Sequence, residues 1–199
     1  MRVNEQTRAN TRTALLDAAA RAFAESGYHE TPIDSVSQLA GVAKGTVYNY
    51  FSSKDDVLRA LVQEACRLAT DAATAVPDQA STEARLQAFI EGNLKWARSR
   101  KPLALLFARQ LLTGSAPIRA LIVEAAAPCI EKVAAILRAG IERGELVPHA
   151  QPEKLALTFI TLTNMLLLQS WEGPLRWPAP TQLPATATAL FLHGIAVRG

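Results

Sequence analysis

The 199-residue sequence predicts an all-α protein of about nine helices. Apolar residues recur at intervals of three and four along most of the chain, which is the period of a helix with one buried face. Proline and glycine fall at the ends of these segments, where they open or terminate helices. Hydrophobic residues make up 49% of the chain, enough for a sizeable core in one large domain or two small ones.

The first two predicted helices are bounded by a glycine each. The first helix ends at Gly27, after an apolar stripe made of Leu15, Ala18, Ala19, Ala22 and Phe23. The second is short: Thr31 is a suitable N-cap, and Pro32 suits the first turn. Gly41 can adopt the left-handed conformation that ends a helix sharply, so a tight turn should follow.

The third predicted helix runs from about Lys44 to Phe51 and places Val47 and Phe51 inward, at a spacing of four. The outward and lateral residues are Lys44, Thr46, Tyr48, Asn49 and Tyr50. Their donors and acceptors are of the kind that read base edges and phosphates. Residues 31–51 thus have the layout of a helix-turn-helix, whose second helix enters the DNA major groove. From spacing alone, an ordinary pair of surface helices is an equal alternative.

A long fourth helix is predicted from the capping-box pattern of Ser53 and Asp56 to a point near Pro77. It leads out of the small N-terminal unit without a flexible linker. A rigid connection of this kind would carry movement from one end of the molecule to the other. The alternative is a long helix that only completes the core.

Capping residues and prolines set the later boundaries. They predict a fifth helix from Ser81 or Thr82, a sixth from Pro102 to about Thr113, a seventh from Pro117 to Gly144, an eighth from Pro152 to near Glu172, and a ninth holding Ala187, Leu190, Phe191, Gly194 and Ile195. Pro128 should kink the seventh helix because it removes a backbone hydrogen bond. The eighth is apolar on nearly all sides, which is typical of a helix buried deeply or against a partner.

Residues 11–62 resemble the N-terminal domain of the TetR (tetracycline-repressor-like) family. The motifs that carry the resemblance are Gly27-Tyr28 after the first helix, Ala40-Gly41-Val42 at the turn, Gly45-Thr46-Val47-Tyr48-Asn49-Tyr50-Phe51, and Ser53-Lys54-Asp55. The resemblance implies a DNA-binding domain over residues 1–60 and a helical effector-binding and dimerisation domain over 61–199. Ala43 departs from the family's usual Ser or Thr, so the recognition helix lacks a side-chain cap worth roughly 1 kcal/mol.

By this resemblance, the residues that face DNA are Thr31, Lys44, Gly45, Thr46, Tyr48, Asn49, Tyr50 and Lys54. Lys44 would be the leading donor to bases or phosphates, and Gly45 would let the helix backbone approach closely. Thr31, Tyr50 and Lys54 would contact the DNA backbone. Arg8 and Arg12 would either clamp flanking phosphates or simply face solvent.

The resemblance also implies a homodimer, formed through the last two helices, that reads an inverted-repeat operator. A small effector would bind in the C-terminal domain. Candidate lining residues are Phe89, Asn93, Trp96, Phe107, Gln110, Thr161, Asn164 and Met165. An apolar cavity with a few amides and hydroxyls suits an uncharged or lipophilic compound. Each of these residues could instead belong to the core or to an interface.

Charge and residue chemistry narrow the function classes. The chain carries a net charge of +3, but residues 1–64 hold seven Lys and Arg against eight Asp and Glu, so DNA affinity would depend on a few placed cations. Cys66 and Cys129 lack a metal-ligand spacing and are interpreted as buried free thiols, with a redox or metal role as the alternative. The three histidines are scattered, and no catalytic, metal or cofactor site is predicted. The polar start and the absence of a long apolar segment predict a cytoplasmic protein with no membrane contact.

The sequence therefore predicts a homodimeric transcriptional regulator, in the first place a repressor released by a small effector. An activator, or a regulator controlled by a protein partner, is an alternative within the same class. A helical lipid- or drug-binding protein without regulatory DNA binding is the alternative from another class. An enzyme is disfavoured because no nucleophile, base or metal set converges.

Overall fold

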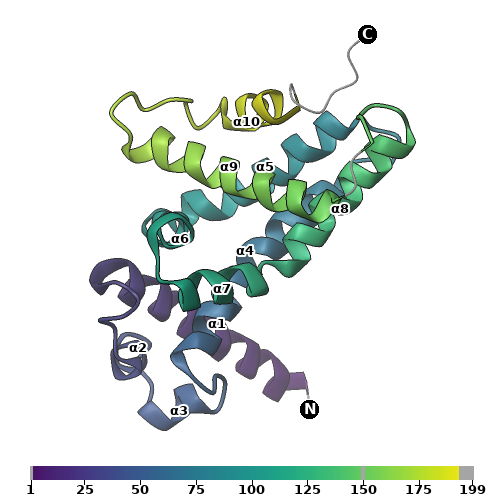
Figure 1. The fold of residues 1–199 in the computed structure, drawn as a ribbon. Helices are drawn as coiled ribbons and strands as arrows, with labels where there is room; N and C mark the ends of the chain where they lie inside the picture. Colours follow the sequence, from purple (N-terminus) through teal and green to yellow (C-terminus); the bar gives the residue numbers. More distant parts are fainter. Residues whose placement is uncertain (1, 149–150, 193–199) are drawn as a thin grey trace.

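The computed structural model describes residues 2–148 and 151–192 (Figure 1). These residues contain ten helices: α1 (Arg2–Ser26), α2 (Ile33–Leu39), α3 (Lys44–Tyr48), α4 (Lys54–Ala75), α5 (Thr82–Ser99), α6 (Lys101–Thr113), α7 (Ala116–Ala125), α8 (Ala127–Glu142), α9 (Pro152–Glu172) and α10 (Leu183–Leu192). The all-α prediction is confirmed. Within the described part of the chain, no helix is both long enough and apolar enough to cross a membrane.

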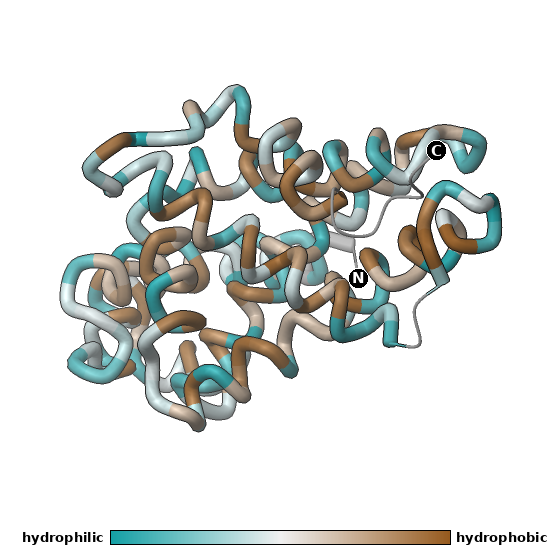
Figure 2. Tube along the Cα trace, turned by 45° about the horizontal axis from the view of Figure 1, so that its top comes forward, coloured by the Kyte–Doolittle hydropathy of each residue, from teal (hydrophilic) through white to brown (hydrophobic). Residues whose placement is uncertain are grey.

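The helices form a small N-terminal lobe and a larger bundle (Figure 1). α1, α2 and α3 build the lobe together with the start of α4, and α4 continues from it into the bundle, where it packs against α5, α7 and α8. The apolar core of the lobe is continuous with that of the bundle, and Phe23, Val36, Val47 and Leu58 are almost fully buried in it. Figure 2 shows apolar residues concentrated where helices face one another. Because α4 contributes to both parts of this core, lobe and bundle are joined by a continuous helix.

Side-chain caps open two of the helices, α4 and α5, where the sequence predicts them. Ser53 Oγ accepts a hydrogen bond from the backbone N–H of Asp56 at 3.1 Å and so caps α4. Ser81 Oγ accepts from the N–H of Ala84 at 3.2 Å at the start of α5. Close packing of α4 and α5 needs Gly92, where a Cβ atom would lie 2.5 Å from the carbonyl oxygen of Leu68.

Two helix predictions are corrected. The single kinked helix through Pro128 is in fact two helices, since α7 ends at Ala125 and Pro128 lies in the first turn of α8. A first-turn proline loses no intrahelical bond, because its missing N–H would be unpaired there anyway. The third helix ends at Tyr48 rather than Phe51. The predicted helical residues Gly194 and Ile195 lie outside the described residues.

α9 and α10 lie side by side at the end of the bundle remote from the lobe (Figure 1). Phe159 of α9 is fully buried, with its ring centroid 5.0 Å from that of Phe191 on α10 and 6.5 Å from that of Phe89 on α5. Other apolar residues of the pair face outward: Met165 is 43% exposed and Leu190 is 50% exposed. The α9–α10 pair therefore has an inner face that completes the core and an outer face that is unusually apolar.

Candidate functional site

The first candidate site is the α2–α3 pair on the surface of the lobe. Gly41 adopts a left-handed conformation (φ +67°) and lets the chain reverse between the two helices. The turn is closed by backbone hydrogen bonds, of 3.1 Å from Gly41 N–H to the oxygen of Gln38 and of 3.0 Å from Val42 N–H to that of Ser37. The side of α3 that carries Val47 is buried in the lobe core. The opposite side of α3 is consequently presented outward.

The outward side of α3 carries polar and aromatic groups on an open surface. Lys44, Gly45 and Asn49 are exposed, and Tyr48 is 48% exposed. A Cβ atom built on Gly45 would meet nothing within 4 Å, so the helix backbone itself is accessible there. Two further predicted residues, Thr46 and Tyr50, are half-buried at the edges of this surface. This surface offers hydrogen-bonding side chains next to a bare stretch of helix backbone.

Lys44 has a partner on the neighbouring helix. Its ammonium donates a hydrogen bond of 2.8 Å to Asp34 Oδ2, across the angle between α2 and α3. This hydrogen bond, followed by the charge of Asp34, raises the pKa of Lys44, so the amine stays protonated at neutral pH. Both side chains are about half exposed, at 59% and 47%, so the ion pair is solvent-screened and readily exchanged. Lys44 therefore remains able to bind an anion in place of Asp34.

Two arginines of α1 lie beside the end of the α3 segment. The guanidinium of Arg8 lies 5.8 Å from the ring centroid of Tyr50, and that of Arg12 lies 5.5 Å from that of Phe51. Both arginines are exposed. The sequence predicts that these two arginines either contact phosphates or face solvent. In the structure, both guanidinium groups lie against the aromatic residues that follow α3. The surface formed by Arg8, Arg12 and the outward residues of α3 is called the α3 face below.

Lys54 has a structural role within the lobe. Its ammonium donates hydrogen bonds to the backbone oxygens of Tyr28, His29 and Thr31 at 2.8, 2.9 and 3.1 Å. An ammonium has three N–H donors, and these carbonyls use all of them. Lys54 therefore ties the start of α4 to the loop that follows α1. The phosphate contact of Lys54 stays a prediction, and it would require Lys54 to exchange one of these bonds.

The prediction for Thr31 is corrected. It is 1% exposed, and its hydroxyl lies within hydrogen-bonding distance of the backbone oxygens of Gly27, at 2.6 Å, and Ala22, at 3.1 Å. A hydroxyl held in this way closes the end of α1 and cannot reach DNA. Thr31 does not cap α2 either, because Pro32 occupies the N-cap position. Thr31 and Lys54 both hold the segment that follows α1 in place.

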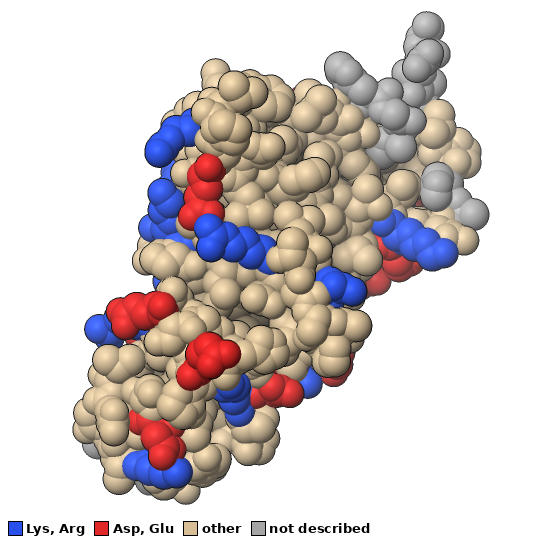
Figure 3. Space-filling view, turned by 60° about the vertical axis from the view of Figure 1, so that its left-hand side comes forward, with Lys and Arg blue, Asp and Glu red and all other residues tan. Residues whose placement is uncertain are grey.

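Charge is not concentrated on the lobe. Figure 3, which views the molecule from one side, shows acidic and basic side chains interleaved over it. This pattern agrees with the slight acidic excess of residues 1–64. Attraction for DNA would therefore come from individual cations such as Arg8, Arg12 and Lys44, whose phosphate contacts would make binding salt-dependent.

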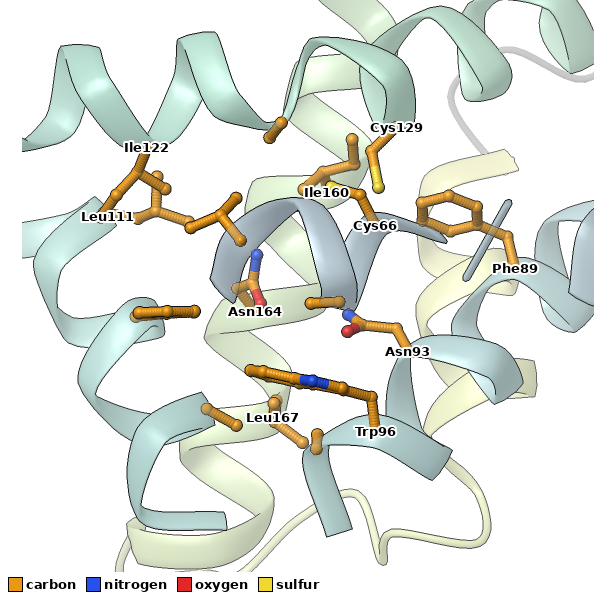
Figure 4. A pocket seen from close by; sticks show the side chains of 16 residues that line it. Cys66, Phe89, Asn93, Trp96, Leu111, Ile122, Cys129, Ile160, Asn164 and Leu167 are labelled. Atoms are coloured by element: carbon orange, nitrogen blue, oxygen red, sulfur yellow. The ribbon is translucent and has the colours of Figure 1, made fainter. Parts of the chain in front are cut away.

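The second candidate site is a cavity of about 80 Å³ inside the bundle (Figure 4). It is lined by residues from α4 to α9: Val62, Ala65, Cys66, Phe89, Asn93, Trp96, Ala97, Ala104, Phe107, Leu111, Ile122, Ala126, Cys129, Ile160, Asn164 and Leu167. Most of these side chains are apolar. The indole of Trp96 stacks on the ring of Phe107, with centroids 5.9 Å apart and planes 14° apart.

The cavity brings together five of the predicted lining residues, which are Phe89, Asn93, Trp96, Phe107 and Asn164. The other three are not part of the lining, so those predictions are corrected. Met165 is on the outer side of α9, and the Thr161 hydroxyl donates a 2.8 Å hydrogen bond to the backbone oxygen of Leu157. Gln110 lies instead near the end of α6, where its amide oxygen approaches Gly114.

Three polar side chains, Asn93, Asn164 and Trp96, line the cavity. Figure 4 shows the side-chain amides of Asn93 and Asn164 projecting into the space above Trp96. The indole Nε1–H of Trp96 is buried and donates to no partner among the described residues. Buried polar groups are normally hydrogen-bonded, so unpaired ones beside a cavity are typical of a site that a ligand or water completes.

Cys66 and Cys129 are two of the eleven lining residues that were not predicted as site residues. Both are free and buried, as predicted from their helical, alanine-rich surroundings. Their shared position in the cavity was not predicted, because α4 and α8 are far apart in the sequence. The only available signal was that each lies on an apolar helix face.

Arg100 connects the cavity side of the bundle to the lobe. Its backbone N–H donates a 3.2 Å hydrogen bond to the oxygen of Trp96, one turn back along α5. Its guanidinium Nη2 lies 2.5 Å from Asp17 of α1 and 3.3 Å from Glu64 of α4. Arg100 therefore links the end of α5, which carries Trp96, to Asp17 of α1 and Glu64 of α4.

Known proteins share this combination of lobe and bundle. Residues 15–61 match the family model described as bacterial regulatory proteins, tetR family. The chain is 28% identical over 137 residues to the fatty acid metabolism regulator protein of Bacillus subtilis (strain 168), covering 66% of this chain and 69% of that protein.

Two solved structures share the fold. The fatty acid degradation regulator FadR from Bacillus halodurans gives a TM-score of 0.76 at 23% identity, covering 94% of this chain and 97% of that one. The transcriptional regulator FadR from Bacillus subtilis, solved in complex with stearoyl-CoA, gives a TM-score of 0.73 at 23% identity, covering 92% of this chain and 98% of that one. At these identities the likeness establishes the fold alone.

Proposed function

We propose that the chain is a member of the TetR family of transcriptional regulators and acts as a homodimeric repressor that a small, mostly apolar effector releases from an inverted-repeat operator. The observation that carries the proposal is the α3 face, which presents polar side chains and bare helix backbone on a lobe joined to the effector cavity by α4. A bacterial regulator that binds chromosomal DNA would act in the cytoplasm, where that DNA lies.

DNA reading is assigned to the outward side of α3. Tyr48 and Asn49 would contact base edges in the major groove, with the open backbone at Gly45 allowing a close approach. Lys44 would exchange Asp34 for a base or a phosphate. Thr46 and Tyr50 are half-buried at the edges of this surface, and their hydroxyl groups would form further hydrogen bonds with DNA.

Phosphate contacts are assigned to Arg8 and Arg12. Their stacking on the aromatic rings beside α3 limits the conformations of both side chains before DNA arrives. Each ordered guanidinium would then bind a phosphate that flanks the contacted bases with less loss of side-chain entropy.

The boundary between the two proposed domains lies within α4. Residues 1–60 would form the DNA-binding domain and residues 61–199 the effector-binding and dimerisation domain. Leu58 lies in the lobe core, and one turn later Val62 lines the cavity. The division therefore falls within a single helix, which favours rigid transmission over flexible tethering.

Dimerisation is assigned to the outer face of α9 and α10. The exposed apolar residues Met165 and Leu190 would be covered by the same face of a second copy. A two-fold arrangement makes such an interface self-complementary. It would also set two α3 helices about one turn of DNA apart, roughly 34–36 Å, as an inverted repeat requires.

The effector is expected to be compact, uncharged and largely apolar. The cavity of about 80 Å³ is below the roughly 300–1,000 Å³ of typical ligand pockets, so a long acyl chain would have to force the helices apart. The amides of Asn93 and Asn164 would give such a ligand one or two hydrogen bonds. Binding would favour a conformation in which cavity expansion reaches Arg100 and the spacing of the two α3 helices no longer fits DNA.

The test is binding of purified protein to the DNA upstream of its own gene, measured by fluorescence anisotropy at one fixed salt concentration. Tyr48→Ala should weaken binding by about 5–150-fold, the equivalent of roughly 1–3 kcal/mol for a lost base contact. Leu112→Ala is the matched control, because this residue is also exposed but lies on α6. Equal binding by wild type and Tyr48→Ala would favour a helical ligand carrier instead.

A further inference from the structure

The cavity contains a pair of thiols that the effector-binding role does not use. Cys66 comes from α4 and Cys129 from α8, and both are buried and free. Their side chains lie next to each other at one end of the cavity (Figure 4). Each thiol is the largest influence on the pKa of the other. No other titratable side chain is among the lining residues of this cavity within the described part of the chain.

This interaction makes the two thiols unequal. Interaction with the Cys129 thiol lowers the pKa of Cys66. Interaction with the Cys66 thiol raises the pKa of Cys129, and burial raises it further. Cys66 is therefore the thiol that ionises first, and the thiolate is the form of cysteine that reacts as a nucleophile. Cys129 lies in place as the second thiol.

We propose that Cys66 and Cys129 form a reversible intramolecular disulfide when a small hydroperoxide enters the cavity, which makes the cavity an oxidation-sensing site as well as an effector site. Formation of the bond does not depend on the proposed function. Its consequence for DNA binding rests on that function.

The chemistry balances with the hydroperoxide as the only oxidant. The Cys66 thiolate attacks one oxygen of ROOH, an S–O bond forms, the O–O bond breaks, and the alkoxide leaves as ROH after taking up a proton. The sulfur of Cys129 then attacks the sulfenic sulfur of Cys66. The S–S bond forms, the S–O bond breaks, and the hydroxyl leaves as water with the Cys129 proton. Two thiols thus lose two electrons and the peroxide gains them.

The structural consequence follows from the geometry of a disulfide. Two non-bonded heavy atoms in contact lie about 3.5–4.0 Å apart, whereas bonded sulfurs lie about 2.05 Å apart, so α4 and α8 must approach by roughly 1.5 Å at this level or rotate to allow it. α4 also carries Leu58 in the core of the lobe. The cross-link would therefore pull on the helix that positions the α3 face, and it would narrow the cavity.

The experiment uses the full chain, reduced and then exposed to hydrogen peroxide. After quenching, the protein is denatured and treated with iodoacetamide, and its intact mass is measured. Wild type should be lighter by two hydrogens and take up no alkyl group, peptide mapping should join the Cys66 and Cys129 peptides, and dithiothreitol should restore both thiols. Cys129→Ala should instead retain a sulfenic acid at Cys66 that reacts with dimedone, and Cys66→Ala should leave Cys129 reduced.

DNA binding is measured on the same samples. The oxidised form should bind the upstream DNA roughly fivefold or more weakly than the reduced form, as expected for an allosteric coupling. Cys66→Ala should show no change on oxidation. The proposal is overturned if both thiols remain alkylatable after peroxide, if the cross-link joins two chains, or if oxidised and reduced wild type bind DNA equally. If the reduced protein does not bind DNA at all, the proposed function fails, while the mass measurement still decides whether the disulfide forms.

Discussion

Replacing Gly45 with alanine should make the protein more stable and a poorer DNA binder at the same time. Gly45 is the second residue of α3, and a Cβ atom added there meets nothing within 4 Å. Alanine is favoured over glycine by roughly 0.8–1.0 kcal/mol in a helix interior, so about half of that is expected in the first turn of a short helix. Without a steric penalty, the free energy of unfolding should rise by about 0.5 kcal/mol.

The same methyl group would stand on the outward backbone surface of α3. If that backbone approaches DNA, the helix must shift out of the groove, at a cost similar to one lost base contact, about 1–3 kcal/mol or 5–150-fold in affinity. Urea unfolding and anisotropy titration at a fixed salt concentration would measure the two effects on one preparation. Unchanged DNA affinity in the stabilised variant would refute the close approach of α3, and a loss of both quantities would show that the methyl group clashes within the protein.

Three other predictions test the fold and the transmission path. The hydrogen bond from Arg143 lowers the pKa of Glu145 to about 2, whereas the ordinary pKa of a glutamate is 4.5. The ionised Glu145 therefore adds fully to the free energy of unfolding above pH 4.5, and this contribution is lost as the pH falls through about 2. Glu145→Gln should accordingly flatten the pH dependence of the urea midpoint in this acidic window, whereas Glu142→Gln should leave that dependence as in wild type. Gly92→Ala should lower the free energy of unfolding by about 1–3 kcal/mol, because its Cβ would lie 2.5 Å from a carbonyl oxygen of α4, and an unchanged thermal midpoint would contradict this packing. Arg100→Gln should keep DNA binding of the free protein nearly unchanged but reduce the effector-induced loss of affinity, and a full effector response in that variant would exclude Arg100 as a link.

Local chemistry made most of the helix boundaries predictable. Ser53 and Ser81 act through hydrogen bonds to residues three positions later, so the sequence alone contains both partners. The effect of Pro128 could not be predicted from the sequence alone. A proline after several helical residues can kink one helix or open a new one, and packing of the flanking segments against the rest of the bundle decides between them.

The sites were predictable only where periodicity determines direction. The outward positions of Gly45 and Asn49 follow from the inward position of Val47, because residues two apart lie on nearly opposite sides of a helix. Thr31 and Lys54 could not be assigned in this way, because the partners of Lys54 are backbone groups 23 to 26 residues away. Met165 is on a helix that is apolar on most sides, so the sequence does not tell which side meets the cavity.

The most direct measurement of the central claim is hydroxyl-radical footprinting of the protein on the DNA upstream of its own gene. Wild type should protect two symmetric half-sites about one helical turn apart, roughly 10 base pairs between centres, and Tyr48→Ala should lose that protection. Equal affinity for this DNA and for random sequence, with no periodic protection, would contradict the assignment of α3 as the helix that reads DNA.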